Sequence, residues 1–426
     1  MNIVIIGAGY VGLPLAIAFA KKYHVKCYDI NINRVNELKK GYDRNQQHTR
    51  KEIFKDNLLF TNDPNDLKNN NYFIITVPTP IKINHQPDLR MLKTASKLVG
   101  RVISKGSLVV YESTTYPGCT EEVCIPLLEK NSKLKFEKNF SVAYSPERIN
   151  PGDKINILKT ITKIVGANDV ATQLKVKKLY SSICKSIFVA NSIKIAESAK
   201  VIENIQRDIN IGLVNQLSKF LNKLNIPTNE VLKAAATKWN FHYYKPGMVG
   251  GHCISVDPYY LTYKAKKIGF SPKLILAGRK INENMGKYIS KKVLELLKFN
   301  NLRYFKKNIA ILGFSFKENI PDYRNTKVLQ LVKEFQKFNI NIKIFDSIVN
   351  KQDVFRDHDV KIYNFKELKN FKYDVIILAV SHKEFLKKIN FYNNFYKNKK
   401  NKIFIDIKNN YLASDFEKNQ YKFFQL

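Results

Sequence analysis

The stretch NIVIIGAGYVG, residues 2–12, decides the fold of the N-terminal part of the chain. Its aliphatic half predicts a buried strand over 2–6, and its glycine-rich half opens a predicted helix over 12–22. In such a turn Gly7 permits the tight bend, Gly9 lets the backbone approach a pyrophosphate, and Gly12 lets helix and strand pack closely. The unpaired N–H groups at the start of the helix would then face the phosphates.

A carboxylate ends the second predicted strand, residues 25–29. Asp29 could accept hydrogen bonds from the ribose hydroxyls of an adenosine there, and it would repel a 2′-phosphate. Strand, glycine turn, helix and carboxylate together predict a site for NAD rather than NADP, against the alternative of a glycine-rich turn with no ligand. Arg34, in the following helix, is either a cofactor contact or a solvated helix charge, and its position favours neither.

Short aliphatic strands continue to alternate with helical stretches, and further strands are expected at 71–77 and 107–111. From residue 194 to 222 there is no Pro and only one Gly, and apolar residues recur at helical spacing, which predicts one long helix linking two domains. From residue 307 the alternation resumes. The elements expected there are strands at 308–312, 341–346, 374–380 and 402–406, and a helix at 326–338.

The predicted fold class is therefore α/β, with two α/β domains of parallel sheets around a helical middle. The expected boundaries are 1–192, 193–295 and 296–426. A length of 426 residues, 44% of them hydrophobic, suits two or three domains with their own cores. No apolar run reaches the ~20 residues of a membrane helix, and no signal peptide is recognised. Five scattered cysteines indicate the reducing cytosol rather than a disulfide framework.

The net charge of +36 has two interpretations. One is a nucleic-acid or membrane-surface partner. The other is coding bias, because Lys is abundant together with Asn, Ile, Phe and Tyr and forms no long basic block or arm. We favour the second interpretation and expect neither a nucleic-acid nor a membrane partner, with a nucleic-acid-binding protein kept as the alternative of another class.

The segment PGMVGGHC, residues 246–253, presents a cysteine directly after two glycines. Adjacent glycines let a backbone approach a ligand closely, and a partly ionised Cys253 could attack a carbonyl. The inert alternative is a small buried side chain, which is the usual state of a cysteine outside a disulfide. Spacing alone leaves both open. Cys119, beside Thr120 and Glu121, lacks a setting that would favour a thiolate.

Three polar residues share one face of the long predicted helix. Lys200, Asn204 and Arg207 are spaced i, i+4, i+7, and Glu203 and Asp208 could neutralise part of that face. Such a pattern is commonly a solvated face. The alternative is that Lys200 and Asn204 point into a cleft between domains and stabilise an oxyanion that grows on a substrate.

Five motifs, in order along the chain, resemble those of the UDP-glucose/GDP-mannose dehydrogenase family. They are VPTP (77–80), ESTTYPG (112–118), YSPERINPG (144–152), GGHCISVDPY (250–259) and FKEN (316–319). Segments 237–241, 259–264 and 316–328 are most similar to the bacterial UDP-N-acetylhexosamine 6-dehydrogenases of the Vi-antigen type. The resemblance spans residues 1 to about 406. Ser255 and Gln216 depart from the residues that many relatives carry, and neither has a proposed chemical role.

The resemblance implies an N-terminal Rossmann-type NAD domain, a central long-helix dimerisation domain and a C-terminal Rossmann-like nucleotide-sugar domain. It implies a cytoplasmic homodimer that uses NAD and no metal ion. The reaction would be a four-electron oxidation of the C6 alcohol of a UDP-N-acetylhexosamine, with UDP-GlcNAc favoured, to the uronate for surface polysaccharide. UDP-glucose is the alternative sugar. The alternatives in chemistry are a two-electron dehydrogenase, which would need neither Cys253 nor Glu147, and an inactive copy.

The family's functional residues are carried over position by position. The residues that would hold NAD are Gly7, Gly9, Tyr10, Val11, Gly12, Asp29, Arg34, Thr79, Thr114 and Arg324. The residues at the reacting carbon would be Cys253, as a nucleophile that forms a thiohemiacetal and then a thioester, with Lys200, Glu147, Asn204 and Asp257. The sugar-nucleotide pocket would be lined by Tyr144, Glu147, Arg148, Lys200, Asn204, Arg207, Tyr243, Tyr244, Lys245, Gly250 and Lys317. The division of acid and base roles among Glu147, Lys200 and Asp257 stays open.

Overall fold

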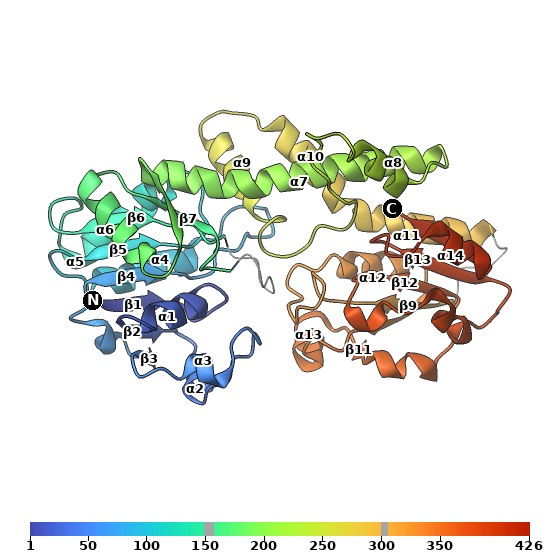
Figure 1. Ribbon diagram of the computed structural model, residues 1–426, viewed down its shortest axis with the longest axis horizontal. Helices are drawn as coiled ribbons and strands as arrows, with labels where there is room; N and C mark the ends of the chain where they lie inside the picture. The colour runs from blue at the N-terminus through green and yellow to red at the C-terminus, as the bar shows by residue number, and fades with distance from the viewer. Residues whose placement is uncertain (149–156, 300–305) are drawn as a thin grey trace. The chain divides into compact units, whose positions relative to one another are not determined.

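The computed structural model describes residues 1–148, 157–299 and 306–426, and the chain divides into two compact units (Figure 1). The first unit contains Met1–Asn204 and Val256–Ser271, and the second contains Ile205–Ser255 and Pro272–Leu426. Residues 149–152 of the YSPERINPG motif lie outside the described residues. No helix of the described ranges is both long enough and apolar enough to cross a bilayer.

An eight-stranded sheet is the centre of the first unit, in the order β3-β2-β1-β4-β5-β6-β7-β8. Its strands are β1 (Asn2–Ile6), β2 (His24–Tyr28), β3 (Leu58–Thr61), β4 (Tyr72–Ile75), β5 (Leu108–Tyr111), β6 (Ser141–Tyr144), β7 (Thr162–Gly166) and β8 (Ser186–Ala190). Neighbouring strands pair in parallel except β6 and β7, which pair antiparallel. The strand order reverses between β1 and β4, and ligands of open α/β sheets bind at the carboxyl ends of strands beside such a reversal.

Helices connect these strands and complete the core of the first unit. They are α1 (Gly12–Ala20), α2 (Ile32–Lys39), α3 (Arg50–Ile53), α4 (Arg90–Gly100), α5 (Ile125–Ser132), α6 (Val170–Ser181) and, from later in the chain, α9 (Asp257–Lys267), with short helical segments η1 (Pro64–Leu67) and η2 (Thr120–Cys124). Ile3 and Ile5 of β1 share one buried cluster with Leu13 and Ala16 of α1. Burial of these aliphatic side chains fixes α1 against the sheet and so places its first residue at the end of β1.

The second unit is built on a six-stranded parallel sheet, in the order β11-β10-β9-β12-β13-β14. Its strands are β9 (Asn308–Leu312), β10 (Asn341–Phe345), β11 (Ile362–Tyr363), β12 (Val375–Leu378), β13 (Lys402–Asp406) and β14 (Tyr421–Gln425). Its helices are α8 (Thr228–Ala235), α10 (Lys273–Glu283), α11 (Met285–Phe299), α12 (Val328–Gln336), α13 (Lys351–His358) and α14 (Ala413–Lys418), with η3 (Phe365–Asn370), η4 (Lys383–Phe385) and η5 (Ile389–Phe395).

The turns that follow β1 and β2 in the first sheet resemble those that follow β9 and β10 in the second sheet. Gly7 follows β1 with φ of +103°, and Gly313 follows β9 with φ of +93°. Asp29 after β2 and Asp346 after β10 each accept a hydrogen bond of 2.8 Å from the backbone N–H one residue beyond that glycine. The second sheet therefore repeats the turn of the first, although the sequence shows no repeat.

The long helix α7 (Ile193–Lys223) has 31 residues, close to the predicted range 194–222. Its N-terminal part belongs to the first unit and its C-terminal part to the second. Its single glycine, Gly212, lies against Gly278 of α10: a Cβ at Gly212 would come within 3.2 Å of the Gly278 backbone. The two glycines let α7 and α10 approach more closely than larger residues would permit.

The predicted α/β class is confirmed, and every predicted strand and helix is present with its ends shifted by a few residues at most. The strands at 308–312 and 402–406 match β9 and β13. Strands β3, β6, β7, β8, β11 and β14 were not predicted. Several of these have only two to four residues, and β8 exposes Phe188, so their apolar pattern is weak.

A buried ion pair ties together three elements of the first unit. Lys163 of β7 donates to the Glu112 carboxylate, directly after β5, at 2.5 Å, and Tyr180 of α6 donates to the other carboxylate oxygen at 2.5 Å. Lys163 also donates to the carbonyl of Pro146 at 2.9 Å, which holds the segment that carries Glu147. Burial raises the pKa of Glu112 to about 7 even though the Lys163 charge lowers it.

We predict that Lys163→Met destabilises the protein more at alkaline pH than at acid pH. Because the pKa of Glu112 is raised from 4.5, the folded protein holds an extra proton, and stability falls as pH rises from 4.5 to about 7. Without Lys163 that pKa rises further, so the variant continues to lose about 1.4 kcal/mol per pH unit above pH 7 while the wild type does not. The measurement is the thermal unfolding midpoint of both proteins from pH 6 to pH 9.

Two further variants check the cause. Lys163→Met combined with Glu112→Gln should lose the extra pH dependence, since no carboxyl remains to titrate. Lys135→Met, which removes an exposed lysine 3.9 Å from Glu129, should leave the midpoint difference nearly constant. A difference between wild type and Lys163→Met that does not change with pH would show that the two groups are not coupled.

Candidate active site

The glycine turn after β1 forms an open backbone cradle. A Cβ on Gly12 would lie 1.8 Å from the carbonyl oxygen of Gly7, so any side chain there is excluded. Among the residues that the structure describes, none apart from Gly9 and its chain neighbours has an atom within 4 Å of the Cβ position of Gly9, so space remains over the turn. Tyr10 and Val11 follow, both half-buried, and α1 begins at Gly12. The turn fits a dinucleotide, with the helix N-terminus available to its phosphates.

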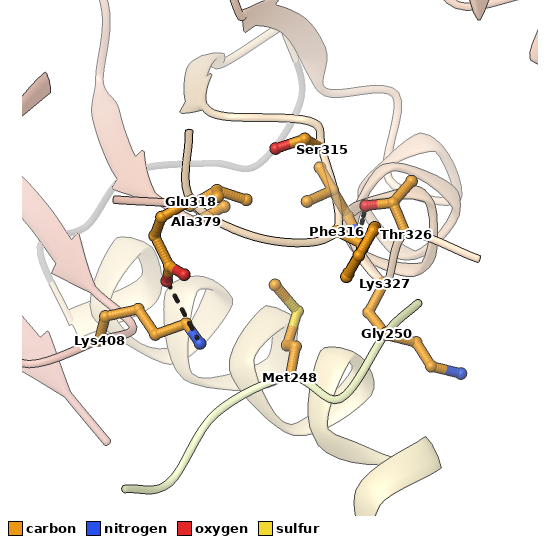
Figure 2. A pocket seen from close by; sticks show the side chains of 11 residues that line it. Met248, Gly250, Ser315, Phe316, Glu318, Thr326, Lys327, Ala379 and Lys408 are labelled. Carbon is orange, nitrogen blue, oxygen red and sulfur yellow. Dashed lines mark hydrogen bonds and ion pairs between the residues drawn. The ribbon is translucent and has the colours of Figure 1, made fainter. Parts of the chain in front are cut away.

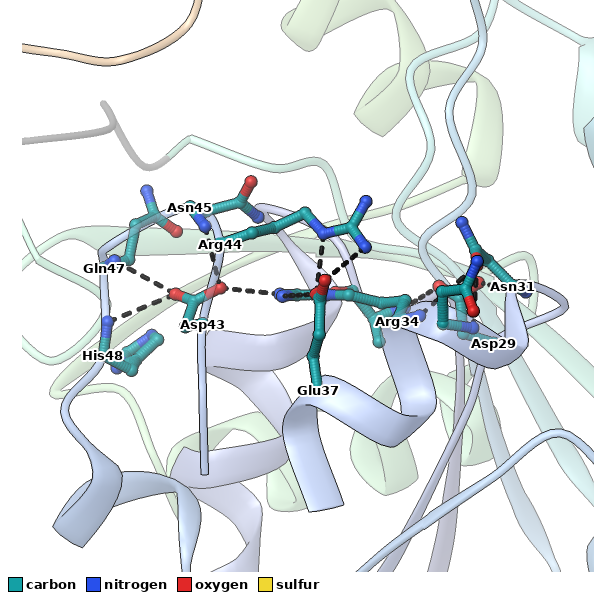
Figure 3. Close-up of polar contacts among 11 residues, drawn as sticks. Asp29, Asn31, Arg34, Glu37, Asp43, Arg44, Asn45, Gln47 and His48 are labelled. Atoms are coloured by element: carbon teal, nitrogen blue, oxygen red, sulfur yellow. Dashed lines mark hydrogen bonds and ion pairs between the residues drawn. The ribbon is translucent and has the colours of Figure 1, made fainter. Parts of the chain in front are cut away.

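Asp29 and Arg34 lie beside this turn (Figure 3). Asp29 accepts from the N–H groups of Ala8 and Asn31, both at 2.8 Å. Arg34 donates to the Ala8 carbonyl at 3.0 Å and to Asp43 at 2.7 Å, and it is only 5% exposed. The interpretation of Arg34 as a solvated helix charge was therefore wrong, because the side chain folds back onto the turn.

The other predicted cofactor contacts of the first unit lie on two adjoining loops. The hydroxyl of Thr79, after β4, donates to the carbonyl of Thr114 at 2.7 Å. Tyr260 of α9 donates to the carbonyl of Thr79 at 2.6 Å. The ESTTYPG loop that carries Thr114 is itself anchored to α7, because the buried Glu197 accepts from the N–H groups of Gly118 and Thr120. These loops follow β4, which borders the reversal in strand order, and its neighbour β5.

Lys200 and Asn204 are buried, with 7% and 6% of their surface exposed, whereas Arg207 is exposed. The interpretation of a solvated face was thus wrong for the first two residues. Asn204 donates to the carboxylate of Asp257 at 2.5 Å. Burial raises the pKa of Asp257 to about 6, while the Lys200 charge and the Asn204 amide limit the rise. A buried carboxyl with this pKa can exchange a proton near neutral pH.

The neighbouring acidic residues of α7 have other partners. Glu203 pairs with Arg148 at 2.9 Å, and Arg148 also donates to the carbonyl of Thr162 at 2.6 Å. Asp208, in the second unit, pairs with the buried Arg279 at 2.6 Å. Arg148 therefore braces the segment that contains the half-buried Glu147.

Tyr144, a predicted substrate contact, is fully buried at the end of β6. Its hydroxyl donates to the carbonyl of Ser113 at 3.1 Å, and burial raises its pKa well above the ordinary value. The side chain therefore supports the ESTTYPG loop from inside the unit. Backbone beyond Tyr144 leads directly to Glu147 and Arg148.

The cysteine loop belongs to the second unit. A Cβ on Gly251, which has φ of +82°, would lie 2.7 Å from the Phe316 ring, and one on Gly250 would lie 2.9 Å from the Asn325 carbonyl. The paired glycines are thus required for packing. Cys253, two residues later, is exposed, while the other four cysteines are buried. The inert interpretation of Cys253 as a small buried side chain was wrong.

Three of the four buried cysteines have a raised pKa. Burial raises the pKa of Cys27 to about 12 and that of Cys184 to about 11. A hydrogen bond with Cys124, with burial, raises the pKa of Cys119 far above its ordinary value, which agrees with the expectation that its setting disfavours a thiolate. The thiols of Cys27, Cys119 and Cys184 therefore stay protonated at neutral pH and are poor nucleophiles.

His252 connects the cysteine loop to the FKEN segment, through a ring contact with Phe316, and to the residues just after it. Its Nε2 lies 2.8 Å from Asp322, which also pairs with Arg324 at 2.6 Å. Burial, with the Arg324 charge, lowers the pKa of His252 to about 4, so it is neutral at pH 7. Arg324 itself is exposed, and Lys317 is half-buried.

A pocket opens beside the same loop, within the second unit (Figure 2). Its lining residues are Met248, Gly250, Ser315, Phe316, Glu318, Thr326, Lys327, Val328, Ala379, Val380 and Lys408. Lys408 lies 3.7 Å from Glu318 across it. Gly250 is thus the predicted substrate residue that the structure places in the lining, and Phe316, Met248 and Lys408 are lining residues that sequence reasoning missed. FKEN was recognised as a motif, but only Lys317 was assigned a role.

The remaining predicted substrate residues lie on the loop before the glycines. Tyr243 and Lys245 are exposed and Tyr244 is half-buried. The Tyr243 hydroxyl donates to Asn229 at 3.1 Å, and that of Tyr244 to Gln206 of α7 at 3.2 Å. Asn215 of α7 binds Gly247 through both its amide nitrogen and its oxygen, at 3.0 and 2.8 Å. The loop is therefore fastened to α7 at Tyr244 and at Gly247.

Comparisons with known proteins agree with this geometry. Three models of the UDP-glucose/GDP-mannose dehydrogenase family match the chain: the NAD binding domain over residues 1–184, the central domain over 194–284 and the UDP binding domain over 310–413. The UDP-N-acetyl-D-glucosamine 6-dehydrogenase of Salmonella typhi is 48% identical over 90% of this chain and 91% of its own length. Protein CapL of Staphylococcus aureus is 47% identical over 93% of both.

More distant relatives share the fold. The UDP-N-acetyl-D-mannosamine dehydrogenase of Pyrococcus horikoshii is 33% identical over 96% of both chains. A solved structure of the UDP-D-ManNAc dehydrogenase from the same organism superposes with a TM-score of 0.89 and covers 100% of this chain and 99% of that one, at 30% identity. The chain therefore belongs to the UDP-glucose/GDP-mannose dehydrogenase family and is an NAD-dependent nucleotide-sugar dehydrogenase.

Proposed function

We propose that the protein oxidises the C6 alcohol of a UDP-N-acetylhexosamine, UDP-GlcNAc in the first place, to the uronate in two successive oxidations. The observation that carries the proposal is the buried set Lys200, Asn204 and Asp257, in a chain whose exposed Cys253 lies four residues before Asp257. A dehydrogenase that stopped after two electrons would need no exposed cysteine. A cation, an amide and a carboxyl with a pKa of about 6 suit proton removal and oxyanion stabilisation.

NAD, held at the glycine turn beside Asp29, would accept one hydride in each of the two oxidations. In the first, the C6 hydroxyl loses its proton to Lys200 or to a water ordered by Asp257, and an aldehyde forms. The sulfur of Cys253 then adds to the aldehyde carbon, and the resulting thiohemiacetal carries an oxygen that Lys200 and Asn204 stabilise. Loss of the second hydride leaves a thioester on Cys253. Water, positioned or deprotonated by Glu147, hydrolyses it and restores the thiol.

The choice of sugar rests on the relatives. The relatives with nearly half of their residues identical to this chain include proteins named for UDP-N-acetyl-D-glucosamine. A relative with about a third of its residues identical is named for the mannosamine epimer. The N-acetyl group is common to both, so we favour a UDP-N-acetylhexosamine over UDP-glucose. The uronate product would serve surface polysaccharide, and the buried, unbridged cysteines fit a reducing cytoplasm.

We also propose that the protein is a homodimer that associates through α7. Leu213, Leu217 and Phe220, spaced four and three residues apart, fall on one face of the helix, and Leu224 follows directly after its last residue; all four are 40% to 58% exposed. An apolar stripe of this spacing on a helix is typical of packing against another helix. A second copy of α7 would cover it symmetrically.

The covalent route predicts a specific loss in a cysteine variant. Cys253→Ala should lower the rate of uronate formation by at least about a thousand-fold, because no thioester can form. Cys184→Ala, which removes a buried cysteine of the first unit, is the matched control and should retain the activity. The measurement is uronate formed from UDP-GlcNAc and NAD, separated by anion-exchange chromatography. Uronate production by Cys253→Ala at the rate of the wild type would contradict the covalent scheme.

The dimer proposal predicts a change of mass in solution. Phe220→Glu places a charge in the centre of the stripe, so the protein should shift from a dimer to a single chain of 49.4 kDa in light scattering after gel filtration. Phe355→Glu, at a phenylalanine of α13 that is 57% exposed, is the control and should stay dimeric. A dimer that survives Phe220→Glu unchanged at micromolar concentration would place the interface elsewhere.

A further inference from the structure

Two arginines and three carboxylates gather beside the glycine turn, at the end of β2 and on α2 (Figure 3). The carboxylates belong to Asp29, Glu37 and Asp43, and the guanidinium groups belong to Arg34 and Arg44. His48 adds no charge at neutral pH, because burial lowers its pKa. The cluster therefore carries more negative than positive charge, next to the turn at which the adenosine ribose of a dinucleotide lies in this fold.

Arg34 is held on two sides. Its Nε donates to the carbonyl of Ala8 at 3.0 Å, within the glycine turn, and its Nη2 donates to Asp43 at 2.7 Å. Its third nitrogen, Nη1, lies 3.8 Å from Glu37 and has no hydrogen-bond partner within the described residues. An arginine at this place in a Rossmann fold is the group that accommodates the 2′-phosphate of NADP.

Asp43 is built into the loop after α2 so that its charge cannot turn away from Arg34. The carboxylate is 4% exposed and accepts hydrogen bonds from the backbone N–H groups of Asn45 at 3.1 Å, Gln47 at 3.0 Å and His48 at 3.3 Å. These bonds fix both oxygens. Arg34 therefore faces a carboxylate that does not move to make room for a phosphate.

Arg44 is neutralised in the same region. It forms a two-bond pair with Glu37, with distances of 2.7 and 2.6 Å, and such bidentate pairs are among the stronger hydrogen-bonded ion pairs. Both cations that could meet a 2′-phosphate thus already have a carboxylate partner, and Asp29 adds a third negative charge at the ribose position.

We propose that Asp43 is a specificity-determining residue for the cofactor: by holding Arg34 in an ion pair, it keeps the guanidinium from binding a 2′-phosphate and so selects NAD over NADP. Asp43 acts through Arg34 and not by touching the ribose. Glu37 assists by holding Arg44. The inference concerns the cofactor alone and does not depend on which sugar is oxidised.

The test is calorimetric binding of NAD and of NADP to the full-length protein without any nucleotide sugar. In Asp43→Asn, which keeps the size of the side chain and one acceptor oxygen, the ratio of the Kd for NADP to the Kd for NAD should fall at least ten-fold. Glu37→Gln should lower the ratio about three-fold. Arg34→Gln added to Asp43→Asn should reverse the gain, because Arg34 is the group that binds the phosphate.

Asp353→Asn, in an exposed pair with Arg356 on α13, is the control and should leave the ratio unchanged. A correctly folded Asp43→Asn with the wild-type ratio would overturn the proposal, since a purely structural role for Asp43 would weaken both cofactors equally. If loss of the backbone hydrogen bonds prevents Asp43→Asn from folding, Glu37→Gln decides the question, because Glu37 accepts none of the loop's backbone bonds at Asp43. An unchanged ratio in Glu37→Gln would then overturn it.

Discussion

The contact between the first and last glycines of the turn after β1 is the constraint on which the cofactor side of the molecule depends. Gly12 lies so close to the Gly7 carbonyl that no side chain fits. The hydroxyl of Thr76, after β4, lies against the same turn, within 2.9 Å of the carbonyls of Ile6 and Gly7. Because Gly12 packs directly on Gly7, α1 can begin close to the end of β1. The turn also presents the N–H and carbonyl of Ala8, which bind Asp29 and Arg34.

Buried charge is the second organising feature. Asp257, Asn204 and Lys200 lie in the first unit with little exposed surface, and their mutual contacts offset part of the cost of removing a carboxylate from water. Lys163 and Glu112 repeat this arrangement, and the Pro146 carbonyl connects them to the segment of Glu147. In a poorly solvated setting each charge acts strongly on its neighbours, which is useful where an alcohol must lose both a proton and a hydride.

Local patterns in the sequence predicted the features that depend on local geometry. The glycine turn, Asp29 and α7 were all predicted, because a tight turn requires glycine at fixed positions and a helix repeats its apolar residues at helical spacing. Both patterns are visible within a short stretch of sequence. Spacing could not separate an exposed Cys253 from a buried one, since the loop before it packs on Phe316 and Asn325, which lie much further along the chain. The burial of Lys200 and Asn204 likewise depends on α9, whose Asp257 is distant in sequence.

Other groups were missed for the same reason. The partner of Arg34 is Asp43, in a loop that carries no motif. The partner of Glu112 is Lys163, which lies 51 residues further along the chain. Neither pair has a sequence signal other than the presence of opposite charges, in a chain with 72 basic and 36 acidic residues. Knowledge of which strand ends lie side by side is needed to find them.

The stoichiometry of the reaction tests the central claim most directly. The purified protein would be incubated with excess NAD and a limiting amount of UDP-GlcNAc, UDP-GalNAc, UDP-ManNAc or UDP-glucose, and the NADH formed per sugar consumed would be measured by absorbance. We predict two NADH for each UDP-N-acetylhexosamine consumed. The rate of NADH formation should be highest with UDP-GlcNAc, and UDP-glucose should give little NADH. One NADH per sugar, with an aldehyde or ketone as the product, would contradict the four-electron oxidation, and activity on UDP-glucose alone would contradict the choice of sugar.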